Sequence, residues 1–392
     1  MDARDNPFIP SAGARPPELA GRGDLTDAFE VLLDRLADGR HGRSMIIRGL
    51  RGVGKTVLLN AFADMATERR WPSVKIEVTG GASVASELMF ELRSVLLAQK
   101  PTRLIREQLT RALASLKSFS LTLPDGSSIR LDVQPLAGRA DSGNLSRDLT
   151  HLFEDVGAVL RKLGAGLVIL IDEAHLLDKD EYEALIRALH EMSQQNLPIV
   201  LVAAGLPQLP ELSRTAKTYA ERLFEYREIG ALDRAAAHAA LVIPVAAAGI
   251  TFDEDAVRHI IRRTQGYPYF IQEFGKAAWL VASGQTITLA DARLADAEAT
   301  RLLDAGFFRA RLAVASPAER QYLREMAALG PGPHRSSDIA KRYKGSSGEP
   351  RAVLIRKGLL YSPEYGQTAF TVPLFDEFIG RHFGEPAHSG NA

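Results

Sequence analysis

Short strand-like runs, either apolar or mixed apolar and charged, alternate with longer amphipathic segments over the first 230 residues of the chain. The runs lie at 44–48, 74–78, 167–171, 199–203 and 224–229, and each has the length of one buried strand. Between them, apolar residues recur three or four positions apart at 24–37, 55–69, 83–98, 102–116, 145–163 and 178–193, a spacing typical of helices. This alternation predicts a parallel sheet covered on both faces. We expect Asp24 to cap the first helix.

One segment departs from this alternation. Residues 119–123 and 129–133 are apolar or alternating, and they flank Pro124-Asp125-Gly126, a sequence typical of a tight turn. We therefore expect a β-hairpin here, as an insertion over 118–134 that projects from the core domain. It would either touch a partner or DNA, or be a passive insertion.

The pattern changes after residue 230. Helical spacing alone is present at 233–248, 253–264, 268–282 and 289–303, which predicts a small helical lid. Three further helices follow at 317–329, 337–343 and 348–357, and then two short strands at 358–362 and 368–372. Three helices followed by a two-stranded piece are typical of a winged helix-turn-helix.

Composition narrows the class of protein. A chain of 392 residues suggests two or three domains. Its 48 Lys and Arg balance 48 Asp and Glu, so any nucleic-acid contact must come from a local cluster. The absence of cysteine excludes disulfides and thiolate chemistry, and the nine histidines lack ligand spacing. We see neither a signal-peptide pattern nor a membrane-length apolar run, so we expect a cytoplasmic protein.

The strongest motif begins directly after the first strand. Gly49-Leu-Arg-Gly-Val-Gly-Lys-Thr fits G-x-x-x-x-G-K-[ST], the P-loop that wraps backbone N–H groups around phosphate oxygens. Lys55 is expected to reach the β- and γ-phosphates of ATP, and the hydroxyl of Thr56 to bind Mg²⁺. The expected nucleotide-binding residues here are Gly49, Gly52, Val53, Gly54, Lys55, Thr56 and Val57.

A second motif follows the apolar strand at 166–171. It ends in Asp172-Glu173, two carboxylates delivered to the carboxyl edge of the sheet. We expect Asp172 to hold Mg²⁺ through water and Glu173 to orient the attacking water. An acidic turn without function is the alternative, and the upstream P-loop disfavours it. The string Asp-Glu-Ala-His is also found in helicases, but nothing here resembles a second motor domain, so we expect His175 at the surface or behind the site.

These motifs resemble those of AAA+ ATPases, in the branch that includes origin-recognition initiators and related archaeal-type ATPases. The resemblance covers about 17–380. Leu19-Ala-Gly-Arg resembles the entry segment that lies against adenine, and 264–270 resembles the lid segment that reaches the nucleotide. It implies ATP or ADP with Mg²⁺ as ligands. It also implies an arginine finger at Arg222, or more weakly Arg214, which would reach a neighbouring copy in a homo-oligomer; a solvated arginine is the alternative.

The sequence departs from the AAA+ pattern in two places. The strand at 199–203 is followed by Ala204-Gly205-Leu206-Pro207, so only Gln208 could supply the polar sensor that the family carries there. Lid arginines have no counterpart near Gly266. Instead Gly-Tyr-Pro, with Pro268, resembles the STAND signalling NTPases, in which this proline contacts the nucleotide. Both departures suggest slow turnover and a nucleotide-held switch.

A basic cluster lies in the C-terminal region. Arg335, Lys341, Arg342, Lys344, Arg351, Arg356 and Lys357 outnumber Asp338 and Glu349. On a recognition helix, Arg351, Arg356 and Lys357 would contact double-stranded DNA. Alternatively, the winged helix docks on a protein, as in a STAND-like signalling or adaptor ATPase, or serves only inside the molecule. A metabolic kinase is disfavoured, because no small-substrate pocket is evident.

The sequence therefore predicts an α/β fold with a P-loop NTPase parallel sheet, a helical lid and a C-terminal winged helix-turn-helix domain. The expected parts are a flexible N-terminus (1–16), an AAA+ core domain (17–230), the lid (231–311), the winged helix (312–382) and a flexible tail (383–392). The expected function is a slow, ATP-dependent switch coupled to DNA.

Overall fold

The computed structural model describes residues 1–11, 13–79, 81, 83–100, 102–207, 209, 220–343 and 345–384. The chain divides into two compact units. The sheet unit comprises Arg22–Gly49 and Lys55–Ile229, and the helical unit comprises Met1–Gly21, Leu50–Gly54 and Gly230–Ala392.

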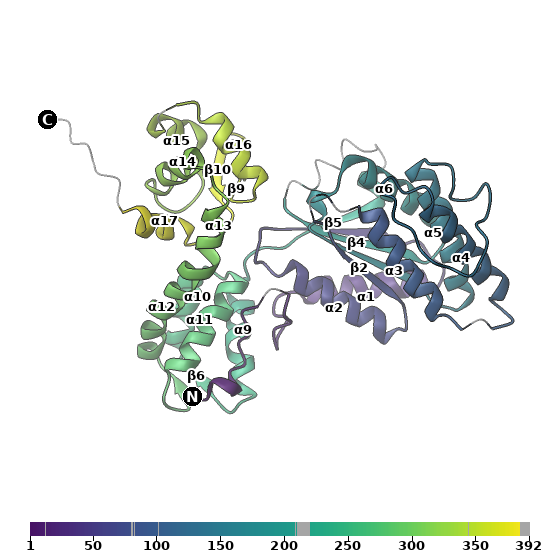
Figure 1. Cartoon of the computed structure of the whole chain (residues 1–392). Helices are drawn as coiled ribbons and strands as arrows, with labels where there is room; N and C mark the ends of the chain where they lie inside the picture. The colour runs from purple at the N-terminus through teal and green to yellow at the C-terminus, as the bar shows by residue number, and fades with distance from the viewer. Residues whose placement is uncertain are drawn as a thin grey trace. The chain divides into compact units, whose positions relative to one another are not determined.

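The sheet unit is built on five parallel strands (Figure 1). They are β1 (Ser44–Arg48), β2 (Ser73–Glu77), β3 (Leu167–Asp172), β4 (Ile199–Gly205) and β5 (Phe224–Glu228), in the order β2-β3-β4-β1-β5. All residues of β3 and β4 are buried, as expected for central strands covered on both faces. The predicted α/β fold with a parallel central sheet is confirmed.

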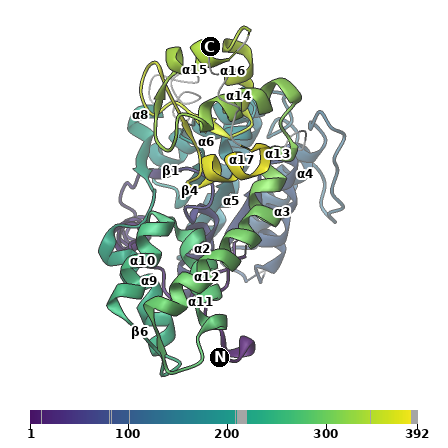
Figure 2. The same cartoon turned by 90° about the vertical axis from the view of Figure 1, so that its left-hand side faces the viewer.

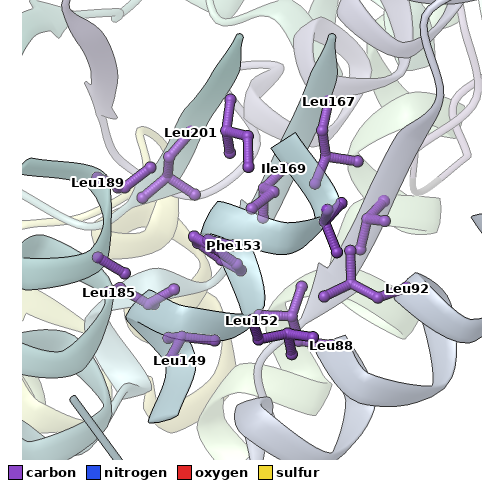
Figure 3. Packing of buried hydrophobic residues seen from close by; sticks show 14 of the residues in the cluster. Leu88, Leu92, Leu149, Leu152, Phe153, Leu167, Ile169, Leu185, Leu189 and Leu201 are labelled. Atoms are coloured by element: carbon purple, nitrogen blue, oxygen red, sulfur yellow. The ribbon is translucent and has the colours of Figure 1, made fainter. Parts of the chain in front are cut away.

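Helices cover both faces of the sheet. On one face lies α2 (Lys55–Glu68) with α1 (Gly23–Ala37) beside it, and the rings of Phe29 and Phe62 stack 4.2 Å apart. On the other face lie α3 (Val84–Ala98), α5 (Leu145–Lys162) and α6 (Lys179–Gln194), with α4 (Arg106–Ser120) packed on α3 and α5. Leu167 and Ile169 of β3 point into this second layer (Figure 3). The residue at the N-cap of α1 is Arg22, so the expected cap Asp24 lies in the first turn instead.

The hairpin expected at 118–134 is absent. Helix α4 continues to Ser120, and the structure assigns no strand between 121 and 144. Phe119 and Leu123 are buried in the core layer of α3, α4 and α5, and this explains why they are apolar. The ammonium group of Lys117 donates hydrogen bonds to the carbonyl oxygens of Leu131, at 3.1 Å, and Val133, at 2.5 Å. The Lys117 side chain thus makes the hydrogen bonds to these carbonyl groups that a partner strand would make in a hairpin.

The first part of the helical unit is a bundle of α9 (Arg234–Ala246), α10 (Glu254–Thr264), α11 (Pro268–Val281) and α12 (Leu289–Leu303), in which α10, α11 and α12 pack against one another (Figure 2). A parallel pair of two-residue strands, β6 (Thr251–Phe252) and β7 (Thr286–Ile287), joins its loops. These strands are too short to produce a hydrophobic period, so the sequence pattern did not predict them.

The second part of the helical unit follows α12 without a break. A π-helix (Asp304–Phe308) and α13 (Arg309–Ala313) precede α14 (Pro317–Ala327), α15 (Ser336–Arg342) and α16 (Gly348–Arg356). An antiparallel sheet of β8 (His334–Arg335), β10 (Gln367–Phe370) and β9 (Leu360–Tyr361) comes next, and then α17 (Phe375–Phe383). The sequence pattern anticipated neither β8 nor α17.

The beginning of the chain is bound to α11. The ring of Phe8 is 2% exposed and lies where a Cβ on Gly275 would come within 2.7 Å of its Cδ1. The indole N–H of Trp279 donates to the carbonyl oxygen of Asp2 at 2.8 Å, and Asn6 donates to the carbonyl oxygen of Lys276 at 3.2 Å. Residues 1–8 therefore do not fit the flexible N-terminus that composition suggested.

In the described part of the chain, no helix has the length and apolar character needed to cross a membrane.

Candidate functional site

The P-loop joins β1 to α2. Gly52 has φ of 79° and Gly54 has φ of 95°, backbone conformations that favour glycine. The N–H of Gly49 donates to the carbonyl oxygen of Gly205 at 3.1 Å, which fixes the start of the loop to the end of β4. Helix α2 begins at Lys55, so its N-terminus follows the loop directly, as a phosphate site requires.

Lys55 is buried, with 6% of its surface exposed. Its ammonium group donates to the carbonyl oxygen of Gly49, 3.0 Å away, so the side chain folds back along the loop. A buried ammonium group needs an oxygen partner, and a phosphate oxygen is a stronger partner than a carbonyl.

Thr56 and Asp172 meet across the sheet unit. The hydroxyl of Thr56, in the first turn of α2, donates to Oδ2 of Asp172, at the end of β3, over 2.5 Å. Asp172 is 3% exposed, and its Oδ1 accepts the N–H of Glu173 at 2.9 Å. A hydroxyl and a carboxylate side by side next to the P-loop fit the oxygen ligands of Mg²⁺. The two expected Mg²⁺ residues are therefore together.

Glu173 occupies an unusual backbone conformation. Its φ of 51° and ψ of 33° are left-handed, which is uncommon for a residue with a side chain, and a 3₁₀ turn (Ala174–Leu176) follows at once. The carboxylate oxygen Oε2 lies 3.4 Å from Nδ1 of His175. The side chain as a whole is partly exposed, although Oε2 itself is buried.

His175 lies behind Glu173 and not at the surface. Its side chain is 9% exposed, and a Cβ on Gly205 would come within 3.1 Å of its backbone nitrogen. Of the two positions expected for His175, the one behind the site is therefore found. The close approach also explains why β4 ends in a glycine.

Two glycine turns of the helical unit pack against the start of α9. A Cβ on Gly266, whose φ is 71°, would fall 2.4 Å from the carbonyl oxygen of Leu232, and the Leu232 N–H donates to the Gly266 carbonyl at 2.8 Å. A Cβ on Gly21, with φ of 66°, would fall 2.7 Å from that of Ala236. Pro268 occupies the first turn of α11, where its ring is well tolerated.

Sequence reasoning missed Tyr267. Its ring lies against the P-loop: a Cβ on Gly52 would come within 2.9 Å of Cε1 and 3.2 Å of the hydroxyl. Tyr267 is 3% exposed, and its hydroxyl has no hydrogen-bond partner among the described residues. Burial raises the pKa of this hydroxyl well above its ordinary value, so it stays protonated. The sequence placed Tyr267 only within the lid segment 264–270 and gave it no role of its own.

Of the other expected polar residues, Arg222, Gln208 and Arg214, the structure describes only Arg222. Arg222 lies in the short helix α8 (Ala220–Leu223), directly before β5, and is exposed. Gln208 and Arg214 fall outside the described residues.

The three expected DNA contacts differ in their surroundings. Arg351 donates to the hydroxyl of Thr368 at 2.7 Å and to the carbonyl oxygen of Gln367 at 3.1 Å. Lys357 donates to the Glu319 carboxylate at 2.7 Å. Of the three, only Arg356 is exposed, and the other two cations already bind groups of their own domain.

Comparisons with known proteins agree with this geometry. A family model described as "AAA ATPase domain" matches 18–202, which contains the P-loop, Asp172 and Glu173. A second model, described as "Domain of unknown function (DUF8462)", matches 305–379. No curated protein matches the sequence of the chain.

Two solved structures share the fold over nearly the whole chain. A Walker-type ATPase of Pyrococcus abyssi is 18% identical, with a TM-score of 0.56, and the match covers 93% of this chain and 97% of that one. The ORC2 protein of Aeropyrum pernix, in its ADP form, is 13% identical, with a TM-score of 0.53 and coverage of 98% and 99%. The resemblance to AAA+ ATPases is thus confirmed for 18–202, which match the AAA ATPase domain, and the chain shares its fold with the Walker-type ATPase of Pyrococcus abyssi and the ORC2 protein of Aeropyrum pernix.

Proposed function

We propose that this protein is an AAA+ molecular switch that binds ATP with Mg²⁺, hydrolyses it slowly, and couples its nucleotide state to double-stranded DNA. The observation that carries the proposal is the contact between Thr56 and Asp172 beside the buried ammonium group of Lys55. A hydroxyl, a carboxylate and a lysine in these places serve one purpose in P-loop proteins, the binding of a Mg-nucleotide.

Each residue of the site has a role in this proposal. Lys55 exchanges the Gly49 carbonyl for phosphate oxygens, while the backbone of the P-loop donates N–H groups to them. Thr56 and Asp172 hold Mg²⁺, which when bound neutralises charge on the phosphates. Glu173 accepts a hydrogen bond from the attacking water and aligns it.

Slow turnover follows from what surrounds Glu173. The end of β4 and the residues after it, 203–207, carry no polar side chain, so this segment offers no side-chain hydrogen bond to the γ-phosphate or the water. Transition-state charge would then be stabilised chiefly by Lys55, Mg²⁺ and an arginine from another copy. We propose Arg222 for that arginine, because it is exposed directly before β5. A homo-oligomer through Arg222 predicts turnover per subunit that rises with protein concentration.

We propose that the second part of the helical unit is a winged helix-turn-helix. Helices α14, α15 and α16 followed by the hairpin of β9 and β10 have the required order, and β8 completes a three-stranded wing. The tip between β9 and β10 carries Tyr365, which is fully exposed. Exposed cations at Arg335, Lys341 and Arg356 supply local positive charge.

The proposal is tested by ATP turnover and DNA affinity on the same preparation. DNA binding is measured with ATP, with ADP and without nucleotide, at two salt concentrations. We expect affinity that depends on the nucleotide and falls with salt. Affinity below detection in every nucleotide state would contradict the DNA part of the proposal and leave the nucleotide part standing.

A STAND-like signalling ATPase that docks on protein is the second candidate. One observation favours it: Arg351 and Lys357 are engaged within their own domain, which reduces the positive charge available to DNA. This candidate predicts ATP binding with no salt-dependent DNA affinity.

A further inference from the structure

Tyr267 is the first ring of an aromatic run in the helical unit. It lies against Gly52 of the P-loop, and its ring centroid is 4.9 Å from that of Phe270. Phe270 in turn contacts Phe307 at 5.6 Å and Phe308 at 5.7 Å, both edge to face. These are the separations and angles that aromatic pairs prefer, so the rings pack as one body.

The run continues into the last helix. Phe308 lies 5.6 Å from Phe375 and 5.4 Å from Phe378, and those two rings stack on one another at 5.8 Å. Phe270, Phe308 and Phe375 are completely buried. Tightly packed buried rings do not deform continuously, so a displacement at one end has to be taken up at the other.

The middle of the run sits on a π-helix. Phe307 and Phe308 close the segment Asp304–Phe308, whose turns are wider than those of α12 before it and α13 after it. The guanidinium group of Arg311 lies 4.2 Å above the Phe307 ring. Such π-helical turns are rare in proteins, and those that exist are found frequently at functional sites.

Two ion pairs hold α17 to this junction. Arg263 of α10 binds both carboxylate oxygens of Glu377, at 2.8 and 2.9 Å. Arg381 binds both oxygens of Asp304, the first residue of the π-helix, at 2.8 and 2.9 Å. Paired hydrogen bonds between a guanidinium and a carboxylate fix orientation as well as distance. We therefore expect α17 to move together with α10 and the π-helix.

We infer that Tyr267 is a positioning residue of the P-loop and that it transmits the state of the loop, through Phe270 and the π-helix, to α17. The inference rests on the proposed function, because the loop must bind ATP for its state to change. A ligand shifts such an equilibrium only if it binds the two arrangements differently. We infer that the difference in affinity arises at Gly52, because its backbone belongs to the phosphate loop and also packs on Tyr267.

The test is hydrogen–deuterium exchange of the full chain, with and without a non-hydrolysable ATP analogue and Mg²⁺. The variants are Tyr267→Leu, which removes the ring, and Tyr267→Phe, which keeps the ring and removes only the hydroxyl. Affinity for the analogue is measured on each variant in parallel. Exchange is compared at three places: the P-loop, the π-helix and α17.

In wild type and in Tyr267→Phe, we expect the analogue to change exchange at all three places. In Tyr267→Leu we expect the P-loop response to persist while the α17 response falls at least severalfold. If Tyr267→Leu does not fold or bind, Phe270→Leu breaks the run one ring later and is expected to behave alike.

Two results would overturn the inference: no response at α17 in wild type that has bound the analogue, or an undiminished α17 response in the leucine variant. Failure of wild type to bind the analogue, with no protection of the P-loop, is a different result, because it removes the proposed function itself.

Discussion

The hydroxyl of Thr56 lies 2.5 Å from the carboxylate of Asp172, although 116 positions separate them in the chain. The first sits in the opening turn of α2 and the second at the end of β3, so the parallel sheet brings both to its carboxyl edge. In the proposed function, this pair holds Mg²⁺.

Replacement of Thr56 separates the role of Mg²⁺ from that of the phosphates. Thr56→Ala removes a hydroxyl ligand, and we expect the affinity for Mg-ATP to fall by about tenfold or more. Thr56→Ser keeps the hydroxyl and is expected to bind nearly as wild type does. Titration of a fluorescent ATP analogue, with Mg²⁺ and with chelator, measures both. Equal loss in the two variants would contradict a ligand role for the hydroxyl.

Glu173→Gln should uncouple binding from turnover. The amide keeps the shape of the side chain but cannot act as a base, so we expect nucleotide affinity close to that of wild type and turnover lower by at least about a hundredfold. Phosphate release at saturating ATP measures turnover. The matched control is Glu183→Gln on α6, which should change neither quantity. Retention of wild-type turnover would assign the catalytic base elsewhere.

Asp155 should make the stability of the sheet unit depend on pH. Burial alone would raise its pKa, but hydrogen bonds from Arg139 and Ser115 and the charges of Arg139 and Arg111 outweigh burial, so the pKa of Asp155 is lowered. A carboxylate whose pKa is lower in the folded state stabilises the fold above about pH 4, its pKa when unfolded. That contribution is lost as the pH falls through the folded-state value.

Asp155→Asn removes the charge that pairs with Arg139 and Arg111, while Arg139 keeps its ion pair with Glu154, and we expect a loss of about 2 kcal/mol at neutral pH. Chemical unfolding at a series of pH values should show the gap to wild type narrowing below about pH 4. Asp132→Asn, in an exposed loop, is the control. A gap that does not change with pH would contradict the role of the ionised carboxylate.

Arg351 and Arg356 should differ if the C-terminal region binds DNA. Arg356→Ala removes an exposed cation, so we expect weaker DNA binding. The slope of log affinity against log salt concentration should fall by about one, and the stability of the protein should not change. Arg351→Ala removes hydrogen bonds to β10 and should lower the melting temperature. Fluorescence anisotropy with labelled duplex and thermal unfolding distinguish the two variants. DNA affinity that is unaffected by Arg356→Ala would favour a protein-docking role.

The sequence predicted the parts of the site that depend on local signals. A fixed glycine and lysine spacing defined the P-loop, and an uninterrupted apolar run placed Asp172 at a strand end. Parts that depend on distant contacts were not predictable. Apolar residues such as Phe119 fit a strand or a buried helix end equally well, and only packing on α3 and α5 decides between them. The sequence also does not show which acidic residue a basic residue pairs with: Lys357, expected to contact DNA, donates to the carboxylate of Glu319 instead.

The binding of Mg-ATP by wild type and Lys55→Ala tests the central claim most directly, because the ammonium group of Lys55 is buried and bonded to the P-loop at Gly49. Isothermal titration is carried out on both proteins after thermal unfolding has established that the variant is folded. We predict saturable binding of Mg-ATP to wild type and a loss of at least about a hundredfold in the variant. Equal affinity in the two proteins would contradict the assignment of the nucleotide site.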